Sequence, residues 1–200
     1  NDQPWSAAFP LALDATDFPP YFPLPSEFTL RGLHSLRLLS GSKKLSFEDL
    51  KAAKHSTRVE LADRILDDLV AHARKSESER VKRAAEVLSR WDRRTEAQSA
   101  GALLFHRFAE EASPTWHSSE PYAVPFDPRR PLETPRGLKD PAKALAALEK
   151  VAAELEKTYG RLDVRWGDAV RFRRGTLDLP ANGGSGNMGV VRTANPGRFV

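Results

Sequence analysis

The residues of this chain with the clearest chemical potential stand at its start, where the sequence reads Asn1-Asp2-Gln3-Pro4-Trp5. The side-chain amide of Asn1 can donate a hydrogen bond to a developing oxyanion without carrying a charge that must be desolvated. No nucleophile accompanies it in the motifs: the chain has no cysteine and no Gly-x-Ser-x-Gly sequence of the kind that exposes a catalytic serine. These motifs alone therefore show no complete catalytic apparatus.

A glycine-rich loop and five histidines are the other candidates for chemistry. The loop spans residues 182–189, but it leads into Val190-Val191 instead of the Gly-Lys-Ser/Thr sequence and helix of a phosphate-binding P-loop. This favours a turn that uses the positive φ angles open to glycine over a nucleotide site. The histidines lack the close spacing of a zinc site, so we interpret them as helix-surface or capping residues: His34, His55, His72, His106 and His117.

The composition predicts one globular core and argues against two classes of partner. Hydrophobic residues make up 40% of the chain and charged residues 29%, which is unlike the profile of a disordered protein. Lys and Arg outnumber Asp and Glu by only 31 to 27, in mixed-sign stretches, so we expect no nucleic-acid partner. Because no apolar run approaches the roughly 20 residues of a membrane span, we expect no membrane partner either.

Capping residues and apolar periodicity predict a succession of helices up to about residue 160. Asp140-Pro141 is the clearest start, because an N-cap is followed by proline at the first helical position, and Ser46 with Asp49 resembles a capping box. The predicted helices span residues 26–39, 46–54, 56 or 57 to 73, 78–91, 95–110 and 140–160. In the first of them, three-residue steps predict one apolar stripe of Leu30, Leu33, Leu36 and Leu39.

Two segments rich in proline and aromatic residues, 1–25 and 113–141, are expected to be irregular. After Gly160 the sequence changes character, and alternation of apolar and polar residues predicts strands at 164–166 and 170–173, with a further β-like run at 188–193. We therefore expect an α+β chain. A helical block over residues 1–160 would be followed by strands over 161–200 that rejoin a sheet whose other strands are largely missing.

The two ends of the chain predict an internal piece of a larger protein. The sequence does not begin with Met, and it breaks off on Phe199-Val200 without a closing helix or a charged tail.

Several separated stretches occur in a characteristic order: Asn1-Asp2-Gln3-Pro4-Trp5, Phe28-Thr29-Leu30-Arg31, Lys54-His55-Ser56-Thr57-Arg58 with residues 61–69, Arg173-Arg174-Gly175, and Asp178-Leu179-Pro180-Ala181-Asn182-Gly183-Gly184. Together they resemble the β-chain of the penicillin acylase family. The resemblance covers nearly the whole chain and is closest to the branch of acyl-homoserine lactone acylases and aculeacin-type acylases. It implies a fragment of an N-terminal nucleophile hydrolase with an αββα sandwich, in the periplasm or secreted.

The resemblance also implies a reaction. In this family a precursor cleaves itself and frees a serine whose own α-amine acts as its base. The serine would lie outside this chain, so the chain alone is expected to be inactive. The complete enzyme would hydrolyse the acyl-amide bond of a small-molecule N-acyl substrate, such as penicillin or an N-acyl-homoserine lactone. The partners of the chain would be the remaining α- and β-chain segments of the same precursor.

The family pattern assigns roles to a few residues. Asn1 matches an Asn, followed closely by Pro, whose amide binds the oxyanion, and it matches equally a later Asn-Asp stretch without an assigned role. Arg31 matches a downstream Arg that supports the site, with Arg37 as the alternative. The chemistry needs no cofactor, although some members hold a structural Ca²⁺, for which Asp14 or Asp17 is the candidate ligand.

Two alternatives follow from the same sequence. The aromatic residues of segments 5–22 and 116–126 are candidates to line an acyl pocket, or else they anchor the core. For the chain as a whole, the alternative to an enzyme is a non-enzymatic helical module whose mixed-charge helices bind a partner protein.

Overall fold

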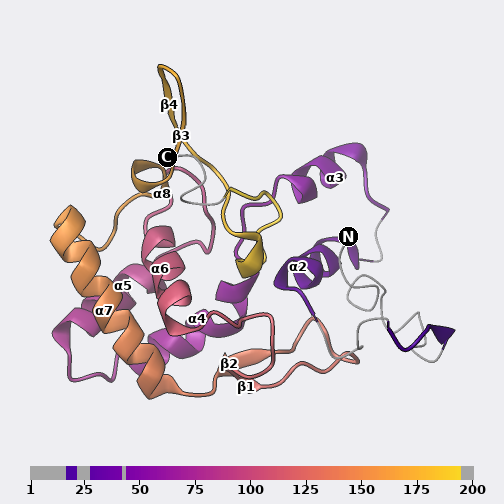
Figure 1. The fold of residues 1–200 in the computed structure, drawn as a ribbon, viewed down its shortest axis with the longest axis horizontal. Helices are drawn as coiled ribbons and strands as arrows, with labels where there is room; N and C mark the ends of the chain where they lie inside the picture. The colour runs from indigo at the N-terminus through magenta and orange to yellow at the C-terminus, as the bar shows by residue number, and fades with distance from the viewer. Residues whose placement is uncertain (1–16, 22–27, 42–43, 195–200) are drawn as a thin grey trace.

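Figure 1 shows the computed structural model, which describes residues 17–21, 28–41 and 44–194. The described part is α+β, as predicted: helices dominate it, and two antiparallel pairs of short strands complete it. In chain order the elements are α2 (Leu30–Leu39), α3 (Phe47–Lys54), α4 (Glu60–Ala73), α5 (Glu79–Ser89), α6 (Ala102–Ala112), β1 (Tyr122–Val124), β2 (Arg136–Leu138), α7 (Pro141–Tyr159), α8 (Trp166–Ala169), β3 (Arg171–Arg174), β4 (Leu177–Pro180) and the 3-10 turn η2 (Gly186–Met188).

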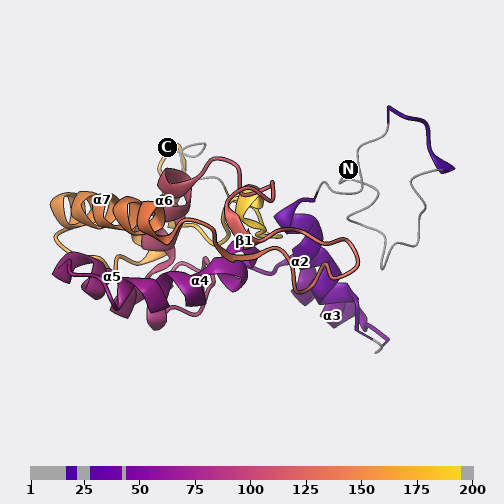
Figure 2. The ribbon, with the colours of Figure 1, turned by 90° about the horizontal axis from the view of Figure 1, so that it is seen from below.

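The core lies between two layers of helices, with α6 and α7 in one layer and α4 and α5 in the other (Figure 2). Helix α4 contributes Leu61, Ile65 and Leu69, whose four-residue spacing places them on one buried face. The rings of Trp91 and Phe105 meet in the same core with centroids 5.0 Å apart. Burial of each such side chain contributes about 1.5–3 kcal/mol, so this shared core holds the helices together.

Local capping predicted α3, α5 and α7 correctly at their N-termini. The Ser46 hydroxyl accepts from the Asp49 amide, and the Asp49 carboxylate accepts from the Ser46 amide, which completes the predicted capping box. Ser78 caps α5 and Asp140 caps α7, and α7 ends at Gly160 in the left-handed conformation, with φ 70°. These helices begin and end where the chain itself supplies the hydrogen bonds of the helix ends.

Helix α2 begins later than predicted, and the predicted apolar stripe winds around it, so that its last residue faces away from the core. Its cap is Thr29, whose hydroxyl accepts from the Gly32 amide at 3.0 Å, and not Ser26, which lies outside the described residues. Leu30 is buried, but Leu39 is 47% exposed. A step of three residues advances about 300° around a helix, so each step falls about 60° behind and the third reaches the opposite face.

Helices α4 and α6 also begin later than predicted. Helix α4 starts at Glu60 and not at residue 56 or 57, and α6 starts at Ala102 and not at Thr95. The segment before α6 instead bonds to distant parts of the chain, for example through the Gly167 amide, which donates to the Ala97 carbonyl at 2.8 Å. Backbone groups satisfied by tertiary contacts do not need a helix.

The strands agree with the sequence prediction in only one place. Strand β3 lies within one residue of the predicted strand 170–173 and pairs with β4 in a hairpin that protrudes from the helices (Figure 1). The predicted strands at 164–166 and 188–193 are wrong, because Trp166 is fully buried at the start of α8 and residues 186–188 form η2. Strands β1 and β2 pair inside the proline-rich segment, where no strand was predicted.

Trp116 and Tyr122 of segment 116–126 anchor the core, and their part in an acyl pocket stays a prediction. Trp116 and Tyr122 are 6% and 2% exposed, and their rings meet edge to face with centroids 5.6 Å apart. The Tyr122 hydroxyl donates to the Trp116 carbonyl at 2.8 Å, and burial raises the pKa of this hydroxyl. Of segment 5–22, only residues 17–21 are described, and Tyr21 there is 83% exposed.

Two further expectations concern the larger architecture. Each sheet in the described residues has two strands, so the αββα sandwich stays a prediction. That the strands of residues 161–200 belong to such a sandwich stays a prediction too. Within the same residues, no helix combines the length and the apolar character needed to cross a membrane.

Candidate functional site

The predicted site residues fall into two groups. Asn1 and Asp14 lie outside the described residues, so their roles stay predictions. Arg31 lies in the first turn of α2 and is half-buried, and Asp17, the other candidate for calcium, is exposed. Across residues 17–21, 28–41 and 44–194, no three His, Asp or Glu side chains come together as metal ligands would.

The glycine-rich loop, which we interpreted as a turn, passes near Arg31 on α2. A β-carbon built on Gly186 would lie 3.8 Å from Arg31 Nη1. Gly189 adopts φ +82°, and a β-carbon there would lie 2.5 Å from the Glu60 β-carbon and 3.0 Å from the Leu30 carbonyl oxygen. The backbone of the loop therefore lies so close to α2 and α4 at Gly189 that no side chain fits between them.

His34 joins this loop to α2 from inside the protein. It is fully buried, with Nδ1 2.6 Å from the Gly189 carbonyl oxygen and Nε2 3.3 Å from the Ser56 hydroxyl. A carbonyl only accepts, so Nδ1 carries the hydrogen and, in the neutral ring, Nε2 accepts from Ser56. The interpretation of His34 as a helix-surface residue is wrong. Its four-residue spacing from buried Leu30 is the signal that places it on the apolar face.

His106 is a second histidine that the sequence placed wrongly on the surface. It is 4% exposed and packs against Trp166, with ring centroids 5.3 Å apart. Its Nδ1 lies 3.5 Å from the Glu110 carboxylate, and this contact holds the pKa of Glu110 below its ordinary value. The role of His106 is therefore to pack α6 against α8.

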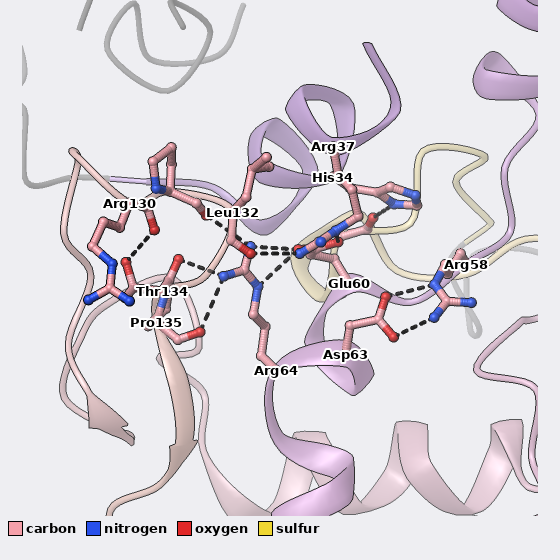
Figure 3. A network of polar contacts seen from close by, with 12 residues as sticks. His34, Arg37, Arg58, Glu60, Asp63, Arg64, Arg130, Leu132, Thr134 and Pro135 are labelled. Atoms are coloured by element: carbon pink, nitrogen blue, oxygen red, sulfur yellow. Dashed lines mark hydrogen bonds and ion pairs between the residues drawn. The ribbon is translucent and has the colours of Figure 1, made fainter. Parts of the chain in front are cut away.

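Glu60 is a fully buried carboxylate clamped between two arginines (Figure 3). Arg64 donates to it at 2.6 and 2.9 Å, and Arg37 donates to it at 2.9 and 3.1 Å. The hydrogen bonds that Arg37 donates to Glu60 hold the pKa of Arg37 above its ordinary value. A charge buried this deeply needs such partners, because desolvation alone would oppose its ionised form.

The same two arginines fasten the proline-rich segment to the helices. Arg64 donates to the carbonyl oxygens of Thr134 at 2.6 Å and Pro131 at 3.1 Å, and Arg37 donates to that of Leu132 at 3.1 Å (Figure 3). Arg37, the alternative to Arg31 as the site-supporting arginine, therefore has a structural task. The chain ties α2, α4 and residues 131–135 together around one carboxylate.

A second ionic cluster lies beside the first and uses one of the sequence stretches quoted above. Arg58 forms a bidentate pair with Asp63, with both distances 2.7 Å, and Arg93 bonds Asp63 and Asp67. The pair holds the pKa of Arg58 above its ordinary value. These four side chains, two positive and two negative, line part of an open hollow of about 800 Å³. The cluster therefore supports the start of α4.

Ser56 and His34 form the serine–histidine contact described above, which is also the pattern of an activated nucleophile. Ser56 is half-buried, and its own carbonyl accepts from the Arg192 amide at 3.0 Å. The His34 ring is fully buried and bonds the Gly189 carbonyl, so we assign this pair to the structure.

The described part of the chain is α+β, and its helix α2, which carries Arg31, contacts both the glycine-rich loop and the buried ionic network. The chain belongs to the penicillin amidase family, whose model matches residues 1–198. This confirms the family inferred from the sequence stretches.

Curated relatives from Pseudomonas agree with the family. The chain is 30% identical over 202 residues to the acyl-homoserine lactone acylase PvdQ of Pseudomonas fluorescens strain Pf0-1, covering 95% of this chain and 25% of the relative. It is 30% identical over 169 residues to PvdQ of strain Pf-5 of that species, covering 80% and 22%. It is 29% identical over 167 residues to PvdQ of Pseudomonas syringae pv. tomato, covering 79% and 21%. The chain thus spans about a quarter of the length of these relatives.

Proposed function

We propose that this chain is part of an amide hydrolase that cleaves the acyl-amide bond of small N-acyl compounds, with N-acyl-homoserine lactones as the first substrates to test and penicillins as the second. The observation that carries the proposal is the match of the penicillin amidase family to residues 1–198. The names of the relatives favour the first substrate class. Family membership also favours the enzyme over the alternative of a helical interaction module.

In the proposed mechanism the nucleophile is a serine that opens the β-chain, outside this chain, with its own α-amine as the base. Attack on the amide carbonyl moves negative charge onto the oxygen, and the Asn1 amide donates a hydrogen bond to it. The amine then leaves, and water hydrolyses the acyl-enzyme. Arg31 supports the site electrostatically, and the remaining α- and β-chain segments of the precursor supply the other groups.

Two further parts of the proposal concern the setting of the enzyme. Asp14 would be a ligand of a structural Ca²⁺ completed by other segments of the precursor, because carboxylate oxygens suit this ion. The enzyme would act in the periplasm or outside the cell, as a precursor activated by its own cleavage.

The test uses the complete acylase that contains this chain, with N-acyl-homoserine lactones of several acyl lengths and a penicillin. We expect release of the free amine from at least one of them. Asn1→Ala should lower kcat by about 10²–10³ and leave KM nearly unchanged, as loss of one oxyanion donor does. Gln98→Ala, which removes an exposed amide elsewhere, is the matched control.

Two results would count against the proposal in different ways. Failure to cleave any N-acyl substrate by a correctly processed enzyme would refute the hydrolase itself. An unchanged kcat in Asn1→Ala, in an active enzyme, would assign Asn1 to the other Asn-Asp stretch of the family and leave the hydrolase standing.

A further inference from the structure

Helix α3 buries none of its residues. It packs against α2 and lies on the side of the molecule away from α5 and α7 (Figure 1). It spans eight residues, and an isolated helix shorter than about 12 residues is marginal in water. Most helices in proteins are stabilised by packing of an apolar face, so α3 needs a neighbour that the described residues do not supply.

Three large apolar side chains gather at the start of α3. Leu45 precedes the N-cap Ser46, and Leu50 is the fourth helical residue, which are the two positions that pack together in a hydrophobic staple. Phe47 lies three residues before Leu50, and so only about 60° from it around the helix. These three side chains, called the α3 patch below, are 46%, 76% and 53% exposed for Leu45, Phe47 and Leu50. Single exposed apolar side chains are ordinary on a protein surface, but a group of them marks a contact site.

Two lysines border the α3 patch. Lys54 follows Phe47 by seven residues and Leu50 by four, which places it on the same face of the helix. Lys44 stands directly before Leu45. Neither lysine forms an ion pair with any residue that the structure describes. An occupant of the patch is therefore expected to combine apolar side chains with a carboxylate.

The size of the α3 patch favours an occupant from the same protein over a free partner. A stable interface between separate proteins buries about 800 Å² on each side, from roughly 20–30 residues, and a helix of eight residues supplies only part of that. A second copy docked about a two-fold axis would also bring the same lysines close together. A segment of the same folded enzyme has little translational freedom left to lose, so a small contact is enough to hold it.

We propose that the α3 patch is the docking site for a segment of the same acylase precursor outside residues 1–200, and that this segment presents apolar side chains beside an Asp or Glu. The inference rests on the proposed function, because it takes the chain to be part of a larger enzyme, as the 25% coverage of the first relative suggests. The apolar side chains would cover Phe47 and Leu50, and the carboxylate would pair with Lys54.

The first experiment measures whether the α3 patch is covered in the complete acylase. Hydroxyl radicals oxidise exposed side chains, and mass spectrometry gives the rate for each one, relative to its rate in the same enzyme unfolded in urea. Phe105, which is 1% exposed in the core, is the buried reference. We expect Phe47 to react as slowly as Phe105, although it is 76% exposed in this chain. A rate for Phe47 close to that in the unfolded enzyme would overturn the inference.

A zero-length carbodiimide cross-linker then identifies the occupant, because it joins a lysine amine only to a carboxylate in contact with it. We expect Lys44 or Lys54 to be joined to an Asp or Glu outside residues 1–200 of the same molecule. A link to an acid of residues 1–16, a link between isotopically distinct copies, or no link at all would overturn the inference. Protection of Phe47 that appears only with vesicles of phosphatidylglycerol would assign the patch to a membrane surface and would overturn it too.

A pair of charge reversals tests the part played by the lysine. Lys54→Glu places a negative charge opposite the proposed carboxylate, so it should speed the oxidation of Phe47 in the complete acylase. Lys157→Glu, which changes a lysine in the last turn of α7, is the matched control and should leave that rate unchanged. Equal rates in the two variants would overturn the proposed pairing. Because these measurements do not use activity, an acylase that cleaves no N-acyl substrate would refute the proposed function and leave the docking site to be decided by the oxidation rates and the cross-links.

Discussion

Glu60→Gln keeps the size of a fully buried side chain and removes its charge, so it isolates what the carboxylate contributes. The Glu60 and Arg64 side chains are 0% and 2% exposed, whereas Arg37 is 37% exposed. Removal of one partner from a buried ion pair costs about 3–5 kcal/mol, because the other charge is left buried without compensation. We expect a loss of about 3–5 kcal/mol in the free energy of unfolding, mainly through Arg64 and only slightly through Arg37, which water screens.

The assay is urea unfolding of the 200-residue chain followed by circular dichroism. Glu48→Gln is the matched control, because Glu48 pairs with Lys51 at 2.9 Å with side chains 72% and 56% exposed. The control should lose less than about 1 kcal/mol. If Glu60→Gln lost no more than the control at an unchanged m value, the carboxylate would not be the centre of the network and the reasoning would be refuted.

The remaining predictions concern Gly189 in the glycine-rich loop and the stability of the chain at acid pH. Gly189→Ala should destabilise the chain by about 1–3 kcal/mol more than Gly175→Ala, because both force a left-handed alanine but only Gly189 also lacks space; equal losses in urea unfolding would exclude the steric part. The contact with His106 lowers the pKa of Glu110 from its ordinary 4.5, so its stabilisation is present above that value and is lost as the pH falls through the lowered pKa. In Glu110→Gln the free energy of unfolding should therefore fall less steeply as the pH drops below 4.5. The same dependence on pH in the variant and the parent chain, measured by urea unfolding at several pH values, would contradict this.

The parts of the fold that depend on neighbouring residues were predictable from the sequence. The N-terminus of α3 is determined by Ser46 and Asp49, and that of α7 by Asp140 and Pro141, which are residues close together in the sequence. The order of the family stretches likewise identified the protein class, because this order can be recognised in the sequence without knowing any contact of the folded chain. In each of these cases, the residues that determine the feature lie within one helical turn or one sequence motif.

The misplaced features depend on contacts between distant residues. Ala97 lies in a segment with helical spacing, yet its carbonyl accepts from Gly167, so α6 begins later. Glu60 and Arg64 read as an ordinary surface pair four residues apart. Arg64 also donates to the carbonyl oxygens of Pro131, Thr134 and Pro135, and no local pattern predicts these contacts. The contact between His34 and the Gly189 carbonyl likewise joins positions that only the folded chain brings together.

The central claim is that the complete enzyme hydrolyses an amide. The most direct measurement is mass spectrometry of the products formed from an N-acyl-homoserine lactone by the complete acylase. The account predicts two products, the free fatty acid and homoserine lactone with its ring and a free amine. A single product that has gained one water with its amide intact would show cleavage of the lactone ring, and would contradict the account.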